Sequence, residues 1–433
     1  LDDYYSKLAL DKKDGLERMC RISGKPFYIR SEDIEFYKSI RVPLPTVSPD
    51  ERHRQKWAFC NIYNLFKIKS ALSGKPIIAM YPPNTPYKIY EHKEWFSGQW
   101  DPMDYGRDVN ADAPFFEQFK KLTLDVPRFD LFVDPASVNS EYTNVALKLK
   151  NCYLVFDSVE AEDCWYGAGY LNTTYSMDSA GLWSSDTCAN CLDSQSMYRS
   201  FWCEMSRDCQ NSYFLYDCRN CESCFMSSNL RHKKYYFLNE PLSKEAYAER
   251  LKEVRFGSRA TVERLLNQFG ELKKKAIHRP NHNENSKNSV GDRLTDCADC
   301  YDVMYSVGSQ NVHYTLGGLH NRDSYHLFGG MNVERGYESL TELNTYGSKF
   351  CYFDKESRDL EYCWDSVGCE NCFGCVALAK RKFCIFNTQY TEDDYWSRVD
   401  ELKTTMLGRG EYGEFYPSHL SPFPYNISLA TSY

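Results

Sequence analysis

Six cysteines are spaced closely enough to bind a metal ion. They form two runs of C-x-x-C-x-x-C: Cys218, Cys221 and Cys224, then Cys369, Cys372 and Cys375. Two residues between cysteines let both thiolates reach one ion, and two such pairs make a tetrahedral zinc site. The spacing also resembles part of a ferredoxin motif, but Ser228 stands where a fourth cysteine would fall. Zinc is therefore the one cofactor that the sequence raises as a hypothesis.

An internal duplication argues against that zinc hypothesis. Cys152 lies 148 positions before Cys300, and an ungapped match at this offset runs to about residue 399. Only one C-x-x-C pair is present in both copies, as Cys221/Cys224 in the first and Cys369/Cys372 in the second. Cys218 falls on Ser366 at this offset. We therefore favour cysteine as a compact core side chain and expect no cofactor.

Other combinations of residues give weaker hints of chemistry. The sequence has no G-x-S-x-G, P-loop or H-E-x-x-H motif, so we assign no catalytic residue and expect a protein that is not an enzyme. Carbohydrate binding or cleavage on an exposed sheet face is an alternative, with five candidate carboxylates: Asp157, Asp163, Asp178, Asp217 and Asp365. A histidine trio in the second copy is expected to be stacked or exposed rather than metal-bound: His313, His320 and His326.

The N-terminal third carries the candidate nucleic-acid interface. Five cations there make up this alternative site: Arg52, Arg54, Lys56, Lys67 and Lys69. Trp57 and Tyr63 lie among them, and basic residues interleaved with aromatics can bind phosphates and stack bases. The whole chain has a net charge of −8, however, which opposes a global electrostatic attraction to nucleic acid.

The duplicated region shows a shorter rhythm. Strand-like runs begin about every 10–12 residues, with Asn, Asp, Ser and Gly between them. We predict a mainly β fold of two duplicated β-solenoid lobes, that is, a right-handed β-helix with two strands and about 20–24 residues per turn. Each lobe is expected to end in a capping helix that starts after Ser243 or Thr391.

The expected domain boundaries follow from these patterns. We place a zinc-ribbon-like, aromatic-rich α+β module at 1–148, the first lobe at 149–257, an amphipathic helix and linker at 258–296, the second lobe at 297–407 and a tail at 408–433.

Two Ser-Gly-Lys-Pro turns, at Ser23 and Ser73, each lead into a strand-like run. With Cys20, they resemble the N-terminal zinc-ribbon-like module of a group of bacterial proteins from candidate phyla, in which a Cys-rich repeat region follows. The resemblance implies a ribbon shape, and no function comes with it. Serine has replaced cysteine at Ser23 and Ser48, so a metal-free ribbon is expected.

Composition sets the remaining expectations. The chain has 433 residues, 42% of them hydrophobic, with 19 Cys and 34 Tyr and no apolar run long enough to span a membrane. The odd cysteine count favours a cytoplasmic protein with free thiols, the alternative being extracellular with oxidised cysteines. We predict a non-enzymatic scaffold that binds a macromolecular partner or self-associates through its repeat faces.

Overall fold

The computed structural model describes residues 2–6 and 15–432. The predicted mainly β class with duplicated β-solenoid lobes is wrong. The described chain is mixed α/β, with 22% helix and 32% strand in several small parallel and mixed sheets, none of them closed. The predicted repeat length is wrong. Neighbouring segments pair in parallel at a spacing of 12 residues, as Tyr153 does with Trp165. The expected 20–24-residue turn with two strands does not occur there.

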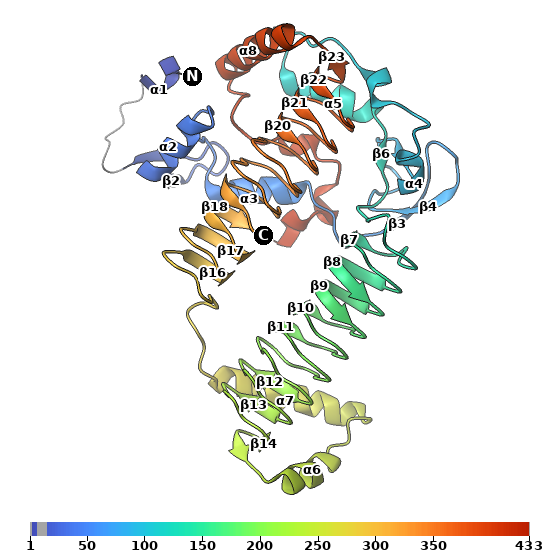
Figure 1. The fold of residues 1–433 in the computed structure, drawn as a ribbon, viewed down its shortest axis with the longest axis vertical. Helices are drawn as coiled ribbons and strands as arrows, with labels where there is room; N and C mark the ends of the chain where they lie inside the picture. The colour runs from blue at the N-terminus through green and yellow to red at the C-terminus, as the bar shows by residue number, and fades with distance from the viewer. Residues whose placement is uncertain (1, 7–14, 433) are drawn as a thin grey trace.

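The first array, residues 133–237, stacks 12-residue segments in parallel (Figure 1). Its first sheet has the order β11-β10-β9-β8-β7. The strands are β7 (Asn144–Leu147), β8 (Tyr153–Glu162), β9 (Trp165–Thr174), β10 (Ala180–Trp183) and β11 (Leu192–Gln195). The stack continues in β12 (Tyr213–Tyr216), β13 (Phe225–Ser228) and β14 (Tyr236–Phe237), and antiparallel β15 (Glu240–Pro241) ends it.

The second array, residues 284–389, repeats this arrangement. Its strands are β16 (Val290–Thr295), β17 (Tyr301–Val307), β18 (Gln310–Leu316), β19 (Arg322–Tyr325), β20 (Arg358–Glu361), β21 (Glu370–Phe373), β22 (Lys382–Ile385) and β23 (Thr388–Gln389). Between β19 and β20 the stacking is carried by single bridges such as Tyr337 with Lys349.

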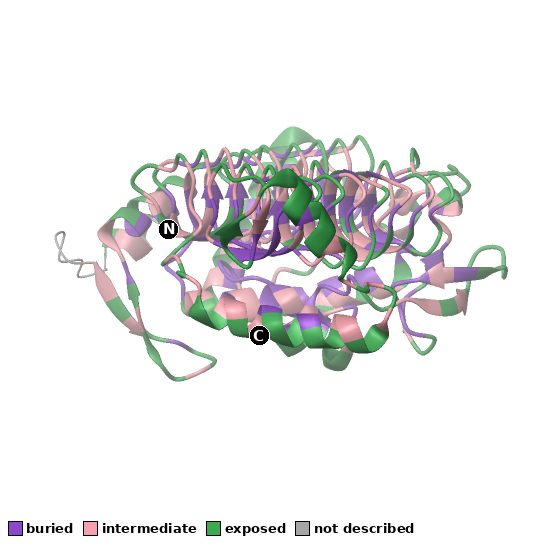
Figure 2. Cartoon of the chain, turned by 90° about the horizontal axis from the view of Figure 1, so that it is seen from below, coloured by how far each residue is buried: buried purple, intermediate pink, exposed green. Residues whose placement is uncertain are grey.

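The backbone of both arrays repeats every three residues. One residue in three has a positive φ, as at Leu154 (52°) and Asp157 (49°), and the residue after it points inward, as Val155 and Ser158 do. Asn and Asp tolerate a positive φ better than other side chains, which explains why they recur between the apolar residues. Many inward positions hold Ser or Cys, with larger residues such as Tyr170 and Leu182 among them, and Figure 2 shows the buried residues running through the interior of the arrays.

Three helices follow the arrays. They are α6 (Lys244–Lys252), α7 (Arg259–Lys275) and α8 (Glu392–Gly408). The predicted caps are confirmed: the Ser243 and Thr391 hydroxyls accept hydrogen bonds from the backbone N–H groups of Ala246 and Asp394. These helices start where the sequence predicts because capping is a local interaction.

The N-terminal segment packs against the second array. It contains α1 (Asp2–Ser6), the hairpins β1 (Leu16–Met19)/β2 (Pro26–Ile29) and β3 (Phe66–Lys69)/β4 (Pro76–Ala79), α2 (Ser31–Ser39), α3 (Pro49–Ala58), β5 (Ile89–Tyr90), α4 (His92–Trp95), α5 (Phe115–Asp125) and β6 (Arg128–Phe129). Both predicted Ser-Gly-Lys-Pro hairpins are confirmed. One apolar core joins this segment to the second array, α8 and the C-terminal tail, whereas most of the first array has a core of its own.

Candidate ligand-binding groove

A groove of about 760 Å³ lies between the two arrays. The first array contributes Val159, Leu171 and Trp183 to its wall, and the second contributes Leu319 and Met331. The N-terminal segment and the tail complete the lining with Trp57, Ile62, Phe132, Phe423 and Leu429. These side chains belong to segments far apart in the chain, so the groove exists only in the assembled fold.

Glycines widen the groove on both sides. Gly181 (φ 64°) and Gly317 (φ 77°) occupy outward positions at which other segments carry a side chain. A Cβ atom on Gly181 would lie 2.7 Å from Asp193 Oδ1, so a larger residue there would displace its neighbour. Gly169 and Gly329 stand 12 residues away from these two glycines, so each side of the groove has a strip without side chains.

One carboxylate stands alone in the apolar part of the groove. Asp157 is accessible from the groove, and within the described residues it has no hydrogen bond or ion pair. The surrounding protein raises the pKa of Asp157 because the charged form is poorly solvated there. Burial, and secondly the charge of Asp157, raise the pKa of the neighbouring Tyr63.

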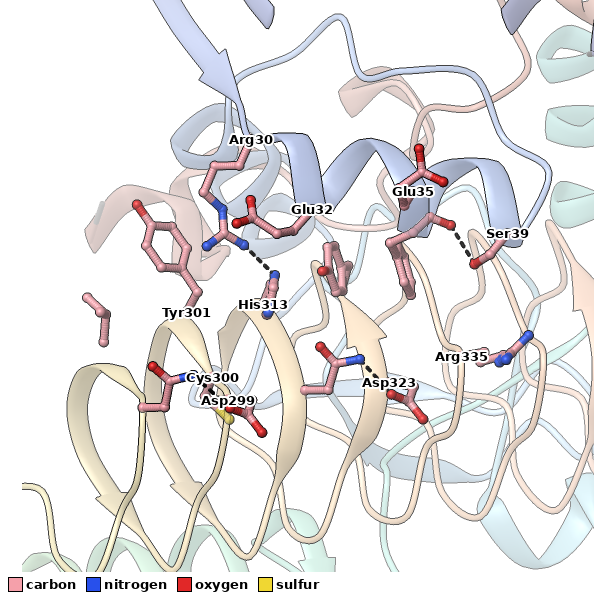
Figure 3. A pocket seen from close by; sticks show the side chains of 15 residues that line it. Arg30, Glu32, Glu35, Ser39, Asp299, Cys300, Tyr301, His313, Asp323 and Arg335 are labelled. Atoms are coloured by element: carbon pink, nitrogen blue, oxygen red, sulfur yellow. Dashed lines mark hydrogen bonds between the residues drawn. The ribbon is translucent and has the colours of Figure 1, made fainter. Parts of the chain in front are cut away.

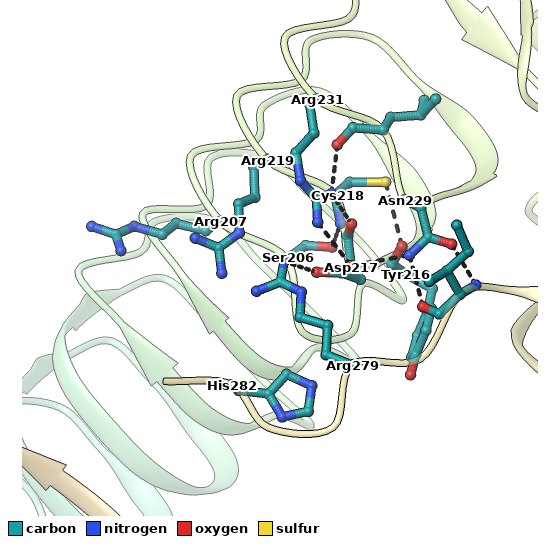
Figure 4. Close-up of polar contacts among 12 residues, drawn as sticks. Ser206, Arg207, Tyr216, Asp217, Cys218, Arg219, Asn229, Arg231, Arg279 and His282 are labelled. Carbon is teal, nitrogen blue, oxygen red and sulfur yellow. Dashed lines mark hydrogen bonds and ion pairs between the residues drawn. The ribbon is translucent and has the colours of Figure 1, made fainter. Parts of the chain in front are cut away.

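Arginines gather at the opposite end of the groove (Figure 4). Arg207, Arg219 and Arg231 lie 12 residues apart in successive segments of the first array, so their side chains lie next to one another. Both Arg207 and Arg219 pair with Glu284.

Beyond them, Arg231 and Arg279 share the carboxylate of Asp217, with Arg231 Nη2 2.8 Å from Asp217 Oδ2. A third carboxylate, Asp208, lies 3.3 Å from Arg207 Nε. Among the groove's own lining residues, Arg293 also pairs with Asp193 at 2.8 Å, so Arg207, Arg219 and Arg293 there face Asp157, Asp193 and Glu284.

A second, more polar pocket of about 590 Å³ separates α2 from the second array (Figure 3). Arg30 Nη2 lies 2.7 Å from Asp33 Oδ1 and 2.7 Å from His313 Nδ1, and the guanidinium stacks 3.7 Å above the Tyr301 ring. Burial opposes ionisation of Asp33, but hydrogen bonds from His313, Arg30 and Tyr314 outweigh it and lower the pKa of Asp33 to about 2. These charges satisfy one another, so this pocket is better explained as a docking interface.

Within the described residues, neither predicted cysteine triplet has its three thiols mutually within 4.8 Å, although Cys221 contacts Cys218 and Cys224, and Cys372 contacts Cys369 and Cys375. All 19 cysteines are free and buried. Thiols in the arrays donate to backbone carbonyls, as Cys221 does to Arg219 at 3.3 Å, whereas Cys20 Sγ accepts from the N–H groups of Ser23 and Ser48. Cys218, Cys224, Cys369, Cys372 and Cys375 also donate to backbone carbonyls. Within the described residues, one group of three potential ligands lies mutually within 4.8 Å: Glu342, Cys351 and Asp354.

The five cations predicted to bind nucleic acid do not form one surface. Arg52 and Lys56 are fully buried, and both pair with Glu338. Arg54 pairs with Glu51, whereas Lys67 and Lys69 are exposed on β3. A phosphate backbone could reach only part of this set without opening the core.

The remaining candidates are also dispersed. Asp365 is buried against Arg128, with 2.8 Å between Oδ2 and Nη2, and Asp163 accepts a hydrogen bond from Asn151. Asp178 is exposed, so the five carboxylates do not form a continuous row. Of the predicted histidines, His313 and His326 stack on Tyr325 and Tyr314, as expected, and His320 is exposed.

No family model matches this chain, and no curated protein matches it. Among the described residues, no helix has the length and apolar character needed to cross a bilayer.

Sequence reasoning missed the groove. Its signal was the recurrence of glycine at 12-residue spacing in both copies, at Gly169 and Gly181 and again at Gly317 and Gly329. That spacing becomes meaningful only when the register between segments is known.

Proposed function

We propose that the protein is a non-enzymatic binding protein whose groove holds an amphiphile with an apolar body and an anionic head, such as a long-chain carboxylate. The observation that carries this proposal is the groove itself: apolar walls from both arrays end at Arg207 and Arg219. Binding of a macromolecular partner, nucleic acid or carbohydrate, and self-association, stay predictions that no contact in the structure favours over this one.

Size and lining support this ligand class. Pockets for small molecules commonly measure about 300–1,000 Å³ and are lined mostly by apolar side chains with a few polar groups. Each methylene group that leaves water for such a site contributes about 0.8 kcal/mol. A long alkyl chain lying along Val159, Leu171 and Met331 therefore gains affinity from length alone.

The head group is assigned from charge. Guanidinium groups bind carboxylates through paired, charge-assisted hydrogen bonds. Arg219 Nε is buried and has no hydrogen-bond partner within the described residues, and its Nη2 atom is shared with Glu284. An anionic head at this end would pair with the guanidinium groups of Arg207 and Arg219, which line the groove.

Blocking the groove tests the apolar half of the proposal. Ala180 lines the groove at an outward position, and Ala180→Trp would fill the space beside it. Titration with a fluorescent long-chain fatty acid should show affinity at least about tenfold weaker than wild type, because the chain loses several buried methylene groups. Ala189→Trp is the matched control at an outward position outside the groove. Equal affinity of both variants and wild type would refute the groove as the site.

Arg219→Gln tests the head-group half. Loss of a charge-assisted hydrogen bond of about 1.5–3 kcal/mol should weaken fatty-acid binding roughly tenfold or more and leave binding of the matching fatty alcohol almost unchanged. Arg199→Gln, at an exposed residue outside the groove, is the control. If acid and alcohol bind equally to wild type, the arginines do not recognise the head.

A further inference from the structure

The interior of the second array holds three acidic groups that face one another. Glu342, Cys351 and Asp354 are almost completely buried, and one ligand atom from each lies within 4.8 Å of the others. Glu342 and Asp354 stand 12 residues apart, at the same inward position of adjacent segments. No lysine, arginine or histidine within the described residues pairs with either carboxylate.

The hydrogen bonds of these groups are incomplete. Glu342 Oε2 accepts from Thr345 Oγ1 at 2.8 Å, and Asp354 Oδ1 accepts from the Ser366 N–H at 2.7 Å. The other carboxylate oxygens, Glu342 Oε1 and Asp354 Oδ2, are buried without a partner, and so is the hydroxyl of Ser348. Leaving buried polar atoms unsatisfied is costly, so this part of the core needs a further explanation.

The duplication supplies an internal comparison. The residues 148 positions earlier are Ser194, Cys203 and Ser206. Ser194 Oγ donates to the Leu192 carbonyl at 3.0 Å and accepts from the Ser206 N–H at 3.3 Å. Backbone groups of the first array therefore satisfy the hydrogen-bonding capacity of this hydroxyl. The same backbone pattern therefore works with neutral serines, and the second array carries two carboxyl groups in their place.

The interior beside Glu342 is closely packed. The residue 12 positions before it is Gly330, and Gly336 also lacks a side chain next to the site. A Cβ atom on Gly336 would lie 3.6 Å from Glu342 Oε2 and 2.4 Å from Val333 Cγ1. The acidic groups thus adjoin positions at which the fold tolerates no larger residue.

We propose that Glu342, Cys351 and Asp354 bind a divalent transition-metal ion, with Zn²⁺ as the best-suited ion, inside the second array. A thiolate and two carboxylates form a mixed S and O ligand set, which suits Zn²⁺ better than Ca²⁺ or Mg²⁺. A water molecule would supply the fourth ligand. Because the site is enclosed, the ion enters while the array folds, and the ligands release their protons as it binds.

The first test is the metal content of the intact chain after refolding in the presence of Zn²⁺, measured by inductively coupled plasma mass spectrometry. Wild type should hold one zinc ion per chain. The double variant Glu342→Ser/Asp354→Ser installs the serines of the first array. Its zinc content per chain should be at least about tenfold lower than that of wild type. Wild type without zinc, or a folded double variant that retains it, would overturn the proposal.

The matched controls are single cysteine variants. Cys351→Ser should lose the ion, and Cys203→Ser, its counterpart in the first array, should keep it. After refolding with Co²⁺, wild type and Cys203→Ser should show a thiolate-to-cobalt charge-transfer band that Cys351→Ser lacks. If zinc is lost instead in Cys221→Ser or Cys372→Ser but kept in Cys351→Ser, the ion sits among the other thiols and the proposed site is wrong.

Discussion

Serine hydroxyls and cysteine thiols at inward positions make nearly the same contacts. Ser206 Oγ donates to the carbonyl of Glu204 at 3.0 Å and accepts from the N–H of Cys218, 12 residues on, at 3.2 Å. Cys218 Sγ donates to the carbonyl of Tyr216 at 3.5 Å. These side chains satisfy backbone groups that the short strands leave unpaired, and for this reason a narrow interior can be built from Ser and Cys.

Removing one such hydroxyl should destabilise the first array. Ser206→Ala leaves the buried N–H of Cys218 without an acceptor, which should lower the free energy of unfolding by about 1–3 kcal/mol. Gln210→Ala, at an exposed outward position four residues away, is the control and should change it little. Urea denaturation followed by circular dichroism compares the two, and equal midpoints would contradict this role of the hydroxyl.

Burial of the cysteines could be predicted from the sequence, but their contacts could not. The duplication showed that few cysteines recur, which argued for core side chains rather than ligands, and all 19 are buried. Glu342 and Asp354 gave no such signal, because neither residue belongs to a recognised ligand motif and their proximity depends on the 12-residue register.

Helices α2 and α3 are held on the second array by buried charges. Lys56 Nζ lies 2.9 Å from Glu338 Oε2, and Arg52 pairs with both Glu338 and Glu414. Burial is the largest influence on Lys56 and lowers its pKa despite the attraction of Glu338. Docking of α3 therefore depends on keeping these carboxylates in place.

Neutralising the shared carboxylate should loosen this interface. Glu338→Gln leaves Arg52 and Lys56 with an uncompensated buried charge, which should cost about 3–5 kcal/mol in the free energy of unfolding. Glu334→Gln, on the exposed face of the same array, is the matched control. Guanidinium denaturation measures the free energy of unfolding of both variants. If Glu338→Gln lowers it no more than Glu334→Gln does, the buried ion pair does not hold α3.

Acidification should weaken the contact of α2. Because the pKa of Asp33 is about 2 in the folded chain and near 4 when unfolded, its carboxylate contributes stability above pH 4 and loses it as pH falls through 2. Asp33→Asn should cost about 2 kcal/mol at pH 6, and about half of that at pH 3. The free energy of unfolding of wild type and of Asp33→Asn, measured at both pH values, tests this. A difference between the two proteins that is the same at pH 6 and pH 3 would argue against the lowered pKa.

Local signals and long-range contacts differ in how far they could be predicted. The caps at Ser243 and Thr391 and the hairpin turns at Gly24 and Gly74 are set by neighbouring residues, and the sequence identified them. The contact of Arg52 with Glu338 spans 286 residues, and nothing local in either segment marks it. For this reason the sequence predicts Arg52 on a nucleic-acid surface, whereas its side chain lies in the core.

At the scale of the whole molecule, the two copies share a backbone pattern but differ in their surroundings. The second array is covered by the N-terminal segment, α8 and the tail, whereas the first array projects away from them (Figure 1). The duplication could be read from the sequence, but the fold class was mistaken because one 12-residue segment was counted as one of two strands in a longer turn. The groove arises where the uncovered array meets the covered one.

The most direct test of the proposed function is photo-crosslinking with a long-chain fatty acid that carries a diazirine on its chain, followed by peptide mapping. We predict that the label falls on peptides from both arrays, those containing Leu171 or Trp183 and that containing Met331, and that excess unlabelled fatty acid removes it. Label confined to exposed aromatic residues outside the groove, such as Tyr166 and Tyr175, would contradict the account.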